Sequence, residues 1–277
     1  MNNIAINLKP WWSTEDFPYE KDFYSKPFSK SKVPDFDLWN EKIRNMNPTI
    51  TKEELNNYNY RCDNFTKNHD GKHILFSGCS YAWGAGIKYE DTWAHQVYKK
   101  ISKDEKVSGY FNIGTSGSSL IHQIATMFQY FEEFGNPDII FINTPDFCRM
   151  YGYSSKKNII IDAVYEHDAS KIIELLSYQY YFMLNAYCKT NNIKLFCFSW
   201  VYAEKNLDYL FKTSKFENLD TFYKYDIDEM KDFVKNYKKE NPFDQFADIA
   251  RDEGHLGNAY HEFWSDFIYN RYKNNNE

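Results

Sequence analysis

Ser80 has the side chain of a nucleophile, and the closely spaced His255 and Asp252 have those of a base and its orienting carboxylate. A serine hydroxyl becomes a nucleophile when a neighbouring imidazole takes its proton, and a carboxylate that accepts the Nδ1–H orients that imidazole. Asp252 lies three residues before His255, so one turn of the chain brings the carboxylate to the ring. Taken alone, the pair Asp252 and His255 also fits an ordinary solvated helix start, and Ser80 an ordinary strand-to-loop junction.

Ser80 belongs to a stretch that reads H-I-L-F-S-G-C-S-Y-A-W-G-A-G-I over residues 73–87. The apolar run that ends in glycine predicts a short buried strand, and turn-like residues follow it. Gly78 lets the strand turn tightly. Ser80 is therefore expected just past a strand end, at the edge where open α/β sheets bind ligands.

A second stretch with chemical potential is N-I-G-T-S-G-S-S-L over residues 112–120, which follows the next predicted strand. A loop at a helix N-terminus presents backbone N–H groups to a developing negative charge. We expect Gly117 to provide such a donor. A plain N-cap by Ser118 or Ser119 is the compatible alternative.

Alternating strands and helices predict how these segments meet. Strands are expected over residues 73–78, 110–113, 138–143 and 193–200, with a weaker fifth over 219–226, and helices over 92–101, 119–134, 170–189, 228–237, 244–251 and 259–272. The run D-I-I-F-I-N suits a central parallel strand that is covered on both faces. We therefore predict an α/β fold, a three-layer α/β/α sandwich with a mostly parallel five-stranded sheet.

The first 70 residues have a different character, because frequent prolines and aromatic residues replace periodic patterns. They are expected to form an irregular N-terminal extension, with a short helix near 37–46, that packs on a main domain over residues 71–277.

Composition excludes several functional classes. The 277-residue chain has a formal net charge of -6 and scattered lysines, so no nucleic-acid partner is expected. Its five cysteines form no C-x-x-C pair, which favours reduced thiols and a cytoplasmic location.

No signal peptide or membrane-spanning run is apparent. The other histidines lack ligand-like spacing, so no metal is expected, and His261 is expected to lie on the surface or pack on the last helix.

Taken together and in this order, the motifs resemble those of the SGNH hydrolases, also called the GDSL esterase/lipase superfamily. The first block is similar to G-C-S-Y-A-W-G at 78–84, the second to N-I-G-T-S-G-S-S at 112–119, and the last to D-E-G-H-L-G at 252–257. The resemblance implies the flavodoxin-like SGNH hydrolase fold and a triad of Ser80, His255 and Asp252. It also implies an oxyanion hole built from the backbone N–H groups of Ser80 and Gly117.

The resemblance covers about residues 57–270 and departs from the family at two places. Cys79 replaces the aspartate that commonly precedes the serine. The third block should supply an oxyanion asparagine in a G-x-N-D motif, whereas the chain reads F-I-N-T-P-D-F-C-R at 141–149. Asn143 is the nearest asparagine, about two to four residues early, and is the expected third donor. Upstream, N-Y-N-Y-R-C-D-N-F at 57–65 is similar to the N-x-x-G-[FY]-R segment of many relatives, without its glycine.

The activity that this resemblance implies is hydrolysis of a carboxylic ester, such as an O-acetyl sugar or a short acyl ester, through an acyl-enzyme and without cofactor or metal. The same residues would also suit transfer of the acyl group to another alcohol. The altered third block leaves a catalytically degraded binding or structural protein as an alternative. An ordinary α/β-hydrolase fits less well, because its G-x-S-x-G motif requires glycine where this chain has Ala82.

Overall fold

The computed structural model describes residues 54–58, 60–115, 118–145, 151–154, 159–162, 170–200, 221, 223, 226–250 and 255–275. The short helix expected near 37–46 and most of the expected N-terminal extension lie outside these residues. The division at residue 70 therefore stays a prediction. Within the described part of that segment, Tyr60, Cys62 and Phe65 are buried in the main hydrophobic core.

The centre of the molecule is a parallel sheet whose strands run in the order β2-β1-β3-β6. These strands span Phe111–Asn112 (β2), Ile74–Gly78 (β1), Ile139–Thr144 (β3) and Lys194–Ser199 (β6). The register pairs Ile74 with Ile139 and Ile139 with Lys194. All six residues of β3 are buried, as its continuous apolar run predicts for a central strand.

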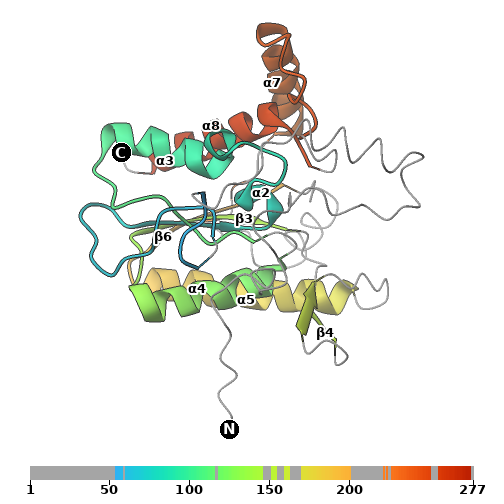
Figure 1. The fold of residues 1–277 in the computed structure, drawn as a ribbon. Coiled ribbons are helices and arrows are strands. Elements are labelled where there is room, and N and C mark those ends of the chain that lie inside the picture. Colours follow the sequence, from blue (N-terminus) through green and yellow to red (C-terminus); the bar gives the residue numbers. More distant parts are fainter. Residues whose placement is uncertain are drawn as a thin grey trace.

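Helices cover both faces of this sheet (Figure 1). On one face lie α3 (Trp93–Asp104) and α8 (Asn258–Asn274), which pack against each other, and on the other lie α4 (Leu120–Phe134) and α5 (Ser170–Thr190). Helix α7 (Ile227–Glu240) packs on α8 and projects away from the sheet. The predicted three-layer α/β/α architecture is confirmed. Several helices start at a side-chain cap on a backbone N–H, provided by Thr92, Ser119 and Asp226.

The sheet has four strands in the described part of the chain, where the sequence predicted five. Most of the weaker candidate, residues 219–226, lies outside the described residues. Two of its members nevertheless bond to the edge strand β6: Cys197 N–H donates to the Thr221 carbonyl (2.9 Å) and Tyr223 N–H to the Cys197 carbonyl (2.8 Å). An additional antiparallel hairpin, β4 (Tyr151–Ser154) and β5 (Ile159–Asp162), follows β3 and was not predicted.

The helix predicted over residues 244–251 is wrong for the described residues 244–250, which form turns. Asp244 Oδ1 accepts the Phe246 N–H at 2.9 Å, a local bond that competes with helical hydrogen bonding. A backbone bridge then pairs Ile249 with Leu256. The chain thereby turns back just before α8.

Three phenylalanines stack across the centre of the sheet. The ring centroid of Phe141 on β3 lies 5.3 Å from that of Phe76 on β1 and 5.1 Å from that of Phe196 on β6. All three side chains are buried. This row ties the central strands to the helical layer that contains Tyr272, whose centroid is 6.1 Å from Phe141.

Truncating the middle ring tests this packing. Phe141→Ala is expected to lower the free energy of unfolding by about 3–5 kcal/mol, because a buried aromatic side chain is replaced by a cavity. Phe243→Ala is the control, since Phe243 is 95% exposed, and should change stability by less than about 0.5 kcal/mol. Urea denaturation measures both. Equal effects in the two variants would contradict this view of the core.

Candidate active site

Ser80 lies where the central strand β1 passes into a short helix. β1 ends at Gly78, and α2 (Ser80–Trp83) begins two residues later. Gly84 ends α2 in the left-handed conformation, with φ 85°, which glycine adopts without strain. The Ser80 side chain is held at this strand-turn-helix junction and is 6% exposed.

The Ser80 hydroxyl faces the imidazole of His255. His255 Nε2 lies 2.7 Å from Ser80 Oγ, although the two residues are 175 positions apart. A serine that donates its proton to Nε2 in this contact leaves the imidazole proton on Nδ1. This distance is within the hydrogen-bond reach that a nucleophile and its general base need.

A turn just before α8 places His255. The Ala250 N–H donates to the His255 carbonyl at 2.9 Å, and the bridge between Ile249 and Leu256 closes the same turn. The Gly257 N–H then bonds to the Asp248 carbonyl at 2.9 Å. These backbone bonds fix the position from which the imidazole reaches β1.

The strand order places this pair at a switch point of the sheet. The chain passes from β1 through α3 to β2 on one side and from β2 through α4 to β3 on the other, with α3 and α4 on opposite faces (Figure 1). The switch point therefore lies between β1 and β3, at their carboxyl ends, where open α/β sheets bind ligands. Ser80 follows β1 at this edge, and Asn143 is near the end of β3.

Asn143 is directly beside the exit of β1, because it pairs in register with Gly78. A Cβ at Gly78 would lie 3.2 Å from the Asn143 Cβ and 2.6 Å from the Ala82 Cβ, so Asn143 points toward the face that carries α2. Its side chain is fully buried, and neither amide atom has a hydrogen-bond partner among the described residues. An unpaired buried amide costs stability, and a role at a ligand-binding site is one explanation for keeping such a group.

Two predicted site residues, Gly117 and Asp252, lie outside the described residues, so their roles stay predictions. The neighbours of Gly117 reach the end of β1, since Thr115 N–H and Ser118 Oγ both donate to the Gly78 carbonyl, at 3.0 and 3.1 Å. Ser119 caps α4 by accepting the N–H of the third helical residue.

An aromatic cluster around Tyr81 packs beside His255. The ring of Tyr81 lies 5.1 Å from that of His255, 4.4 Å from that of Trp200 and 5.5 Å from that of Trp264, measured between centroids. Tyr81 is itself 6% exposed. The imidazole of His255 is thus packed on one side by a rigid aromatic cluster.

His261 is fully buried, one turn into α8, and is not the surface residue that the sequence also allowed. Its Nδ1 accepts the backbone N–H of Trp93, the first residue of α3, at 3.1 Å. Burial, with a smaller contribution from His255, lowers the pKa of His261 to about 3, so this ring is neutral near pH 7. Sequence reasoning missed this link between α8 and α3, because nothing local distinguishes a buried histidine from an exposed one.

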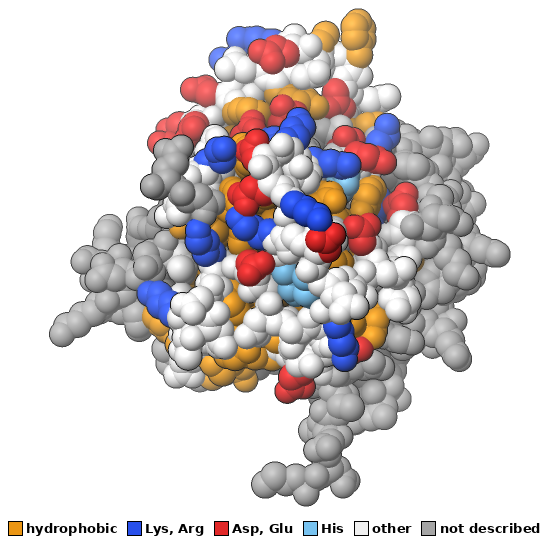
Figure 2. Space-filling model, turned by 90° about the vertical axis from the view of Figure 1, so that its left-hand side faces the viewer, with side chains coloured by type: hydrophobic (Ala, Val, Ile, Leu, Met, Phe, Trp, Pro, Cys, Tyr) orange, Lys and Arg blue, Asp and Glu red, His pale blue; other side chains and the backbone are white. Residues whose placement is uncertain are grey.

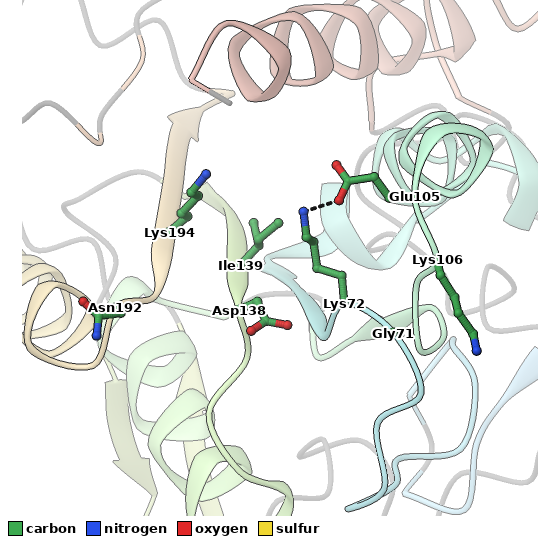
Figure 3. Close-up of a pocket in the computed structure, with 8 residues that line it drawn as sticks. All are labelled: Gly71, Lys72, Glu105, Lys106, Asp138, Ile139, Asn192 and Lys194. Atoms are coloured by element: carbon green, nitrogen blue, oxygen red, sulfur yellow. Dashed lines mark hydrogen bonds and ion pairs between the residues drawn. The ribbon is translucent and has the colours of Figure 1, made fainter. Parts of the chain in front are cut away.

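A separate pocket of about 510 Å³ lies at the opposite edge of the sheet, among residues that precede β1, β3 and β6 (Figure 3). Among its charged groups, Lys72 pairs with Glu105, Lys106 pairs with Asp70, and the Asp138 carboxylate accepts the His73 N–H. On the face shown in Figure 2, Lys and Arg side chains are interspersed with Asp and Glu. This pocket lies away from Ser80 and contributes nothing to the site there.

In the described part of the chain, no group of three or more His, Cys, Asp or Glu side chains is arranged to hold a metal ion. Nor is any helix among these residues long and apolar enough to cross a membrane.

No family model and no curated protein sequence matches this chain. Among solved structures, it is similar to a psychrotrophic esterase, EstA from Pseudoalteromonas sp., in a crystal structure inhibited by monoethylphosphonate. The two are 14% identical, the match covers 73% of this chain and 96% of the esterase chain, and the TM-score is 0.43. The fold assignment itself rests on the strand order and the two helical layers described above.

The close approach at Gly78 gives a steric prediction. Gly78→Ala places a methyl group 2.6 Å from the Ala82 Cβ and 2.8 Å from the Asn143 carbonyl oxygen, so the strand or α2 must shift. Gly135→Ala is the control, because Gly135 also has a positive φ but nothing within 4 Å of the added carbon. Chemical denaturation should show that Gly78→Ala costs about 1–3 kcal/mol more than Gly135→Ala. Equal costs would refute the tight packing.

Proposed function

We propose that this protein is a serine esterase of the SGNH hydrolase type, which hydrolyses a carboxylic ester. The observation that carries the proposal is the 2.7 Å contact between Ser80 Oγ and His255 Nε2. The resemblance to SGNH hydrolases predicts that these two residues act together, although most of the chain separates them. They meet at the edge of a parallel sheet where such sheets bind ligands.

In the proposed reaction, Ser80 Oγ attacks the ester carbonyl carbon while His255 Nε2 takes the hydroxyl proton. The tetrahedral intermediate collapses, His255 returns the proton to the leaving alkoxide, and an acyl-enzyme on Ser80 remains. Water, deprotonated by His255, then releases the carboxylic acid and regenerates the serine.

The remaining roles follow from the same resemblance. Asp252 is proposed to accept the Nδ1–H of His255 and stabilise the imidazolium, which is supported by the backbone turn that joins Ala250 to His255. The developing oxyanion is proposed to accept hydrogen bonds from the backbone N–H groups of Ser80 and Gly117 and from the Asn143 amide. The unpaired, buried amide of Asn143 supports its inclusion.

A small acyl group suits this site best, because Ser80 is only 6% exposed and the Tyr81 ring packs beside His255. We propose a short acyl ester or an O-acetylated carbohydrate as the substrate class. Transfer to an added alcohol would leave less free acid than hydrolysis does, so the products distinguish an esterase from an acyltransferase.

Removing the serine hydroxyl tests the nucleophile. Wild-type protein should hydrolyse p-nitrophenyl acetate, and Ser80→Ala should reduce the rate to that of the uncatalysed reaction, because no acyl-enzyme forms. Ser77→Ala is the matched control, since Ser77 is buried on β1, three residues before Ser80, and its hydroxyl has no partner among the described residues. An unchanged rate in folded Ser80→Ala would remove Ser80 from the mechanism.

Asn143 gives a second test, in which activity and stability should separate. Asn143→Ala is expected to lower kcat roughly a hundredfold to a thousandfold through loss of one oxyanion donor. The free energy of unfolding should fall by less than about 1 kcal/mol, because the substitution also removes an unpaired buried amide. Full activity in this variant would show that Asn143 only packs.

A further inference from the structure

Arg61 carries a buried charge next to the segment that follows Ser80. Its side chain is 4% exposed. Nη1 donates to the backbone carbonyls of Gly84 and Ile87, each at 3.0 Å, and Nε donates to the Glu54 carboxylate at 2.9 Å. A guanidinium suits such a place, because its planar fork serves several acceptors at once.

Two aromatic rings also contact this guanidinium. Its central carbon lies 5.7 Å from the ring centroid of Trp83, the last residue of α2, and 5.7 Å from that of Tyr89. Both carbonyls and both rings belong to residues 83–89. Arg61 joins the segment before the sheet to the chain that leaves the nucleophile helix.

The turn that Arg61 contacts is bonded directly to Ser80. Gly84 N–H and Ala85 N–H donate to the Ser80 carbonyl at 2.8 and 2.9 Å. A Cβ at Gly84 would lie 2.3 Å from Thr92 Cγ2 and 3.1 Å from Arg61 Nη1. The turn is therefore held between Arg61 on one side and Thr92, the N-cap of α3, on the other.

We propose that Arg61 is a positioning residue: by holding the carbonyls of Gly84 and Ile87, it fixes the 84–87 turn and, through it, the backbone of Ser80 against His255. The effect on catalysis rests on the proposed esterase function, whereas the hold on the turn does not. Without the guanidinium, both carbonyls lose a charged donor in a buried place, and the Gly84 carbonyl still accepts the Ile87 N–H at 3.2 Å. The turn is therefore expected to loosen, most of all around Ile87.

The kinetic test compares Arg61→Ala and Arg61→Lys with Lys72→Met. The control also removes a partly buried cation with a carboxylate partner, but at the opposite edge of the sheet (Figure 3). With p-nitrophenyl acetate, kcat of Arg61→Ala should fall about tenfold to a hundredfold with KM within about threefold, because a misplaced nucleophile slows chemistry more than binding. Lys72→Met should keep the wild-type kcat.

Chemical rescue separates positioning from general loss of stability. Added guanidinium or methylguanidinium at low millimolar concentration should restore part of kcat in Arg61→Ala and leave wild type and Lys72→Met unchanged. Arg61→Lys should be intermediate, since an ammonium group lacks the fork. If Arg61→Ala does not fold, Arg61→Lys decides the question. An unchanged kcat in the folded variant, or a loss that guanidinium does not reverse, would overturn the proposal.

Amide hydrogen exchange gives a readout that does not depend on esterase activity. Exchange over residues 80–87 should rise in Arg61→Ala and stay at the wild-type level in Lys72→Met. If wild-type protein hydrolyses no ester, the proposed function fails, but hydrogen exchange still tests the role of Arg61. Unchanged exchange over residues 80–87 in Arg61→Ala would overturn the positioning role. Faster exchange confined to residues 80–87 would support the hold of Arg61 on the turn.

Discussion

The contact between Ser80 and His255 is the constraint on which the arrangement of the site depends. One residue leaves the central strand β1 and the other precedes the last helix, so their meeting requires α8 to lie correctly over the sheet. The packing of α8 on α3 provides this, and the bond from Trp93 N–H to His261 Nδ1 fixes the two helices to each other. Because burial keeps His261 neutral, this link adds no charge beside His255.

The exit of β1 is the second half of the same constraint. The Gly78 carbonyl accepts bonds from both Thr115 and Ser118, so the loop after β2 closes on the end of β1. The missing side chain at Gly78 leaves room for α2 and for Asn143. Small residues at this junction thus let several backbone segments converge near the serine, which is how a layered sheet makes space for chemistry at its edge.

The sequence predicted the layers well, because buried strands such as β3 read as continuous apolar runs and helices start at local caps such as Ser119. It paired Ser80 with His255 only through the resemblance of ordered motifs. Features that depend on distant contacts escaped it: the burial of His261, the two carbonyls that Arg61 holds, and the turns at 244–250. In that last case a local side-chain bond from Asp244 outcompeted a sequence that looks helical.

The central claim is that Ser80 is a nucleophile activated by His255. The most direct measurement is labelling with a fluorophosphonate probe, followed by peptide mass spectrometry of wild type and of His255→Gln. The account predicts a single adduct on Ser80 in wild type and at least about a hundredfold slower labelling in the variant, since loss of the base leaves a neutral hydroxyl. Folded wild-type protein that takes up no probe at Ser80, or equal labelling without His255, would contradict it.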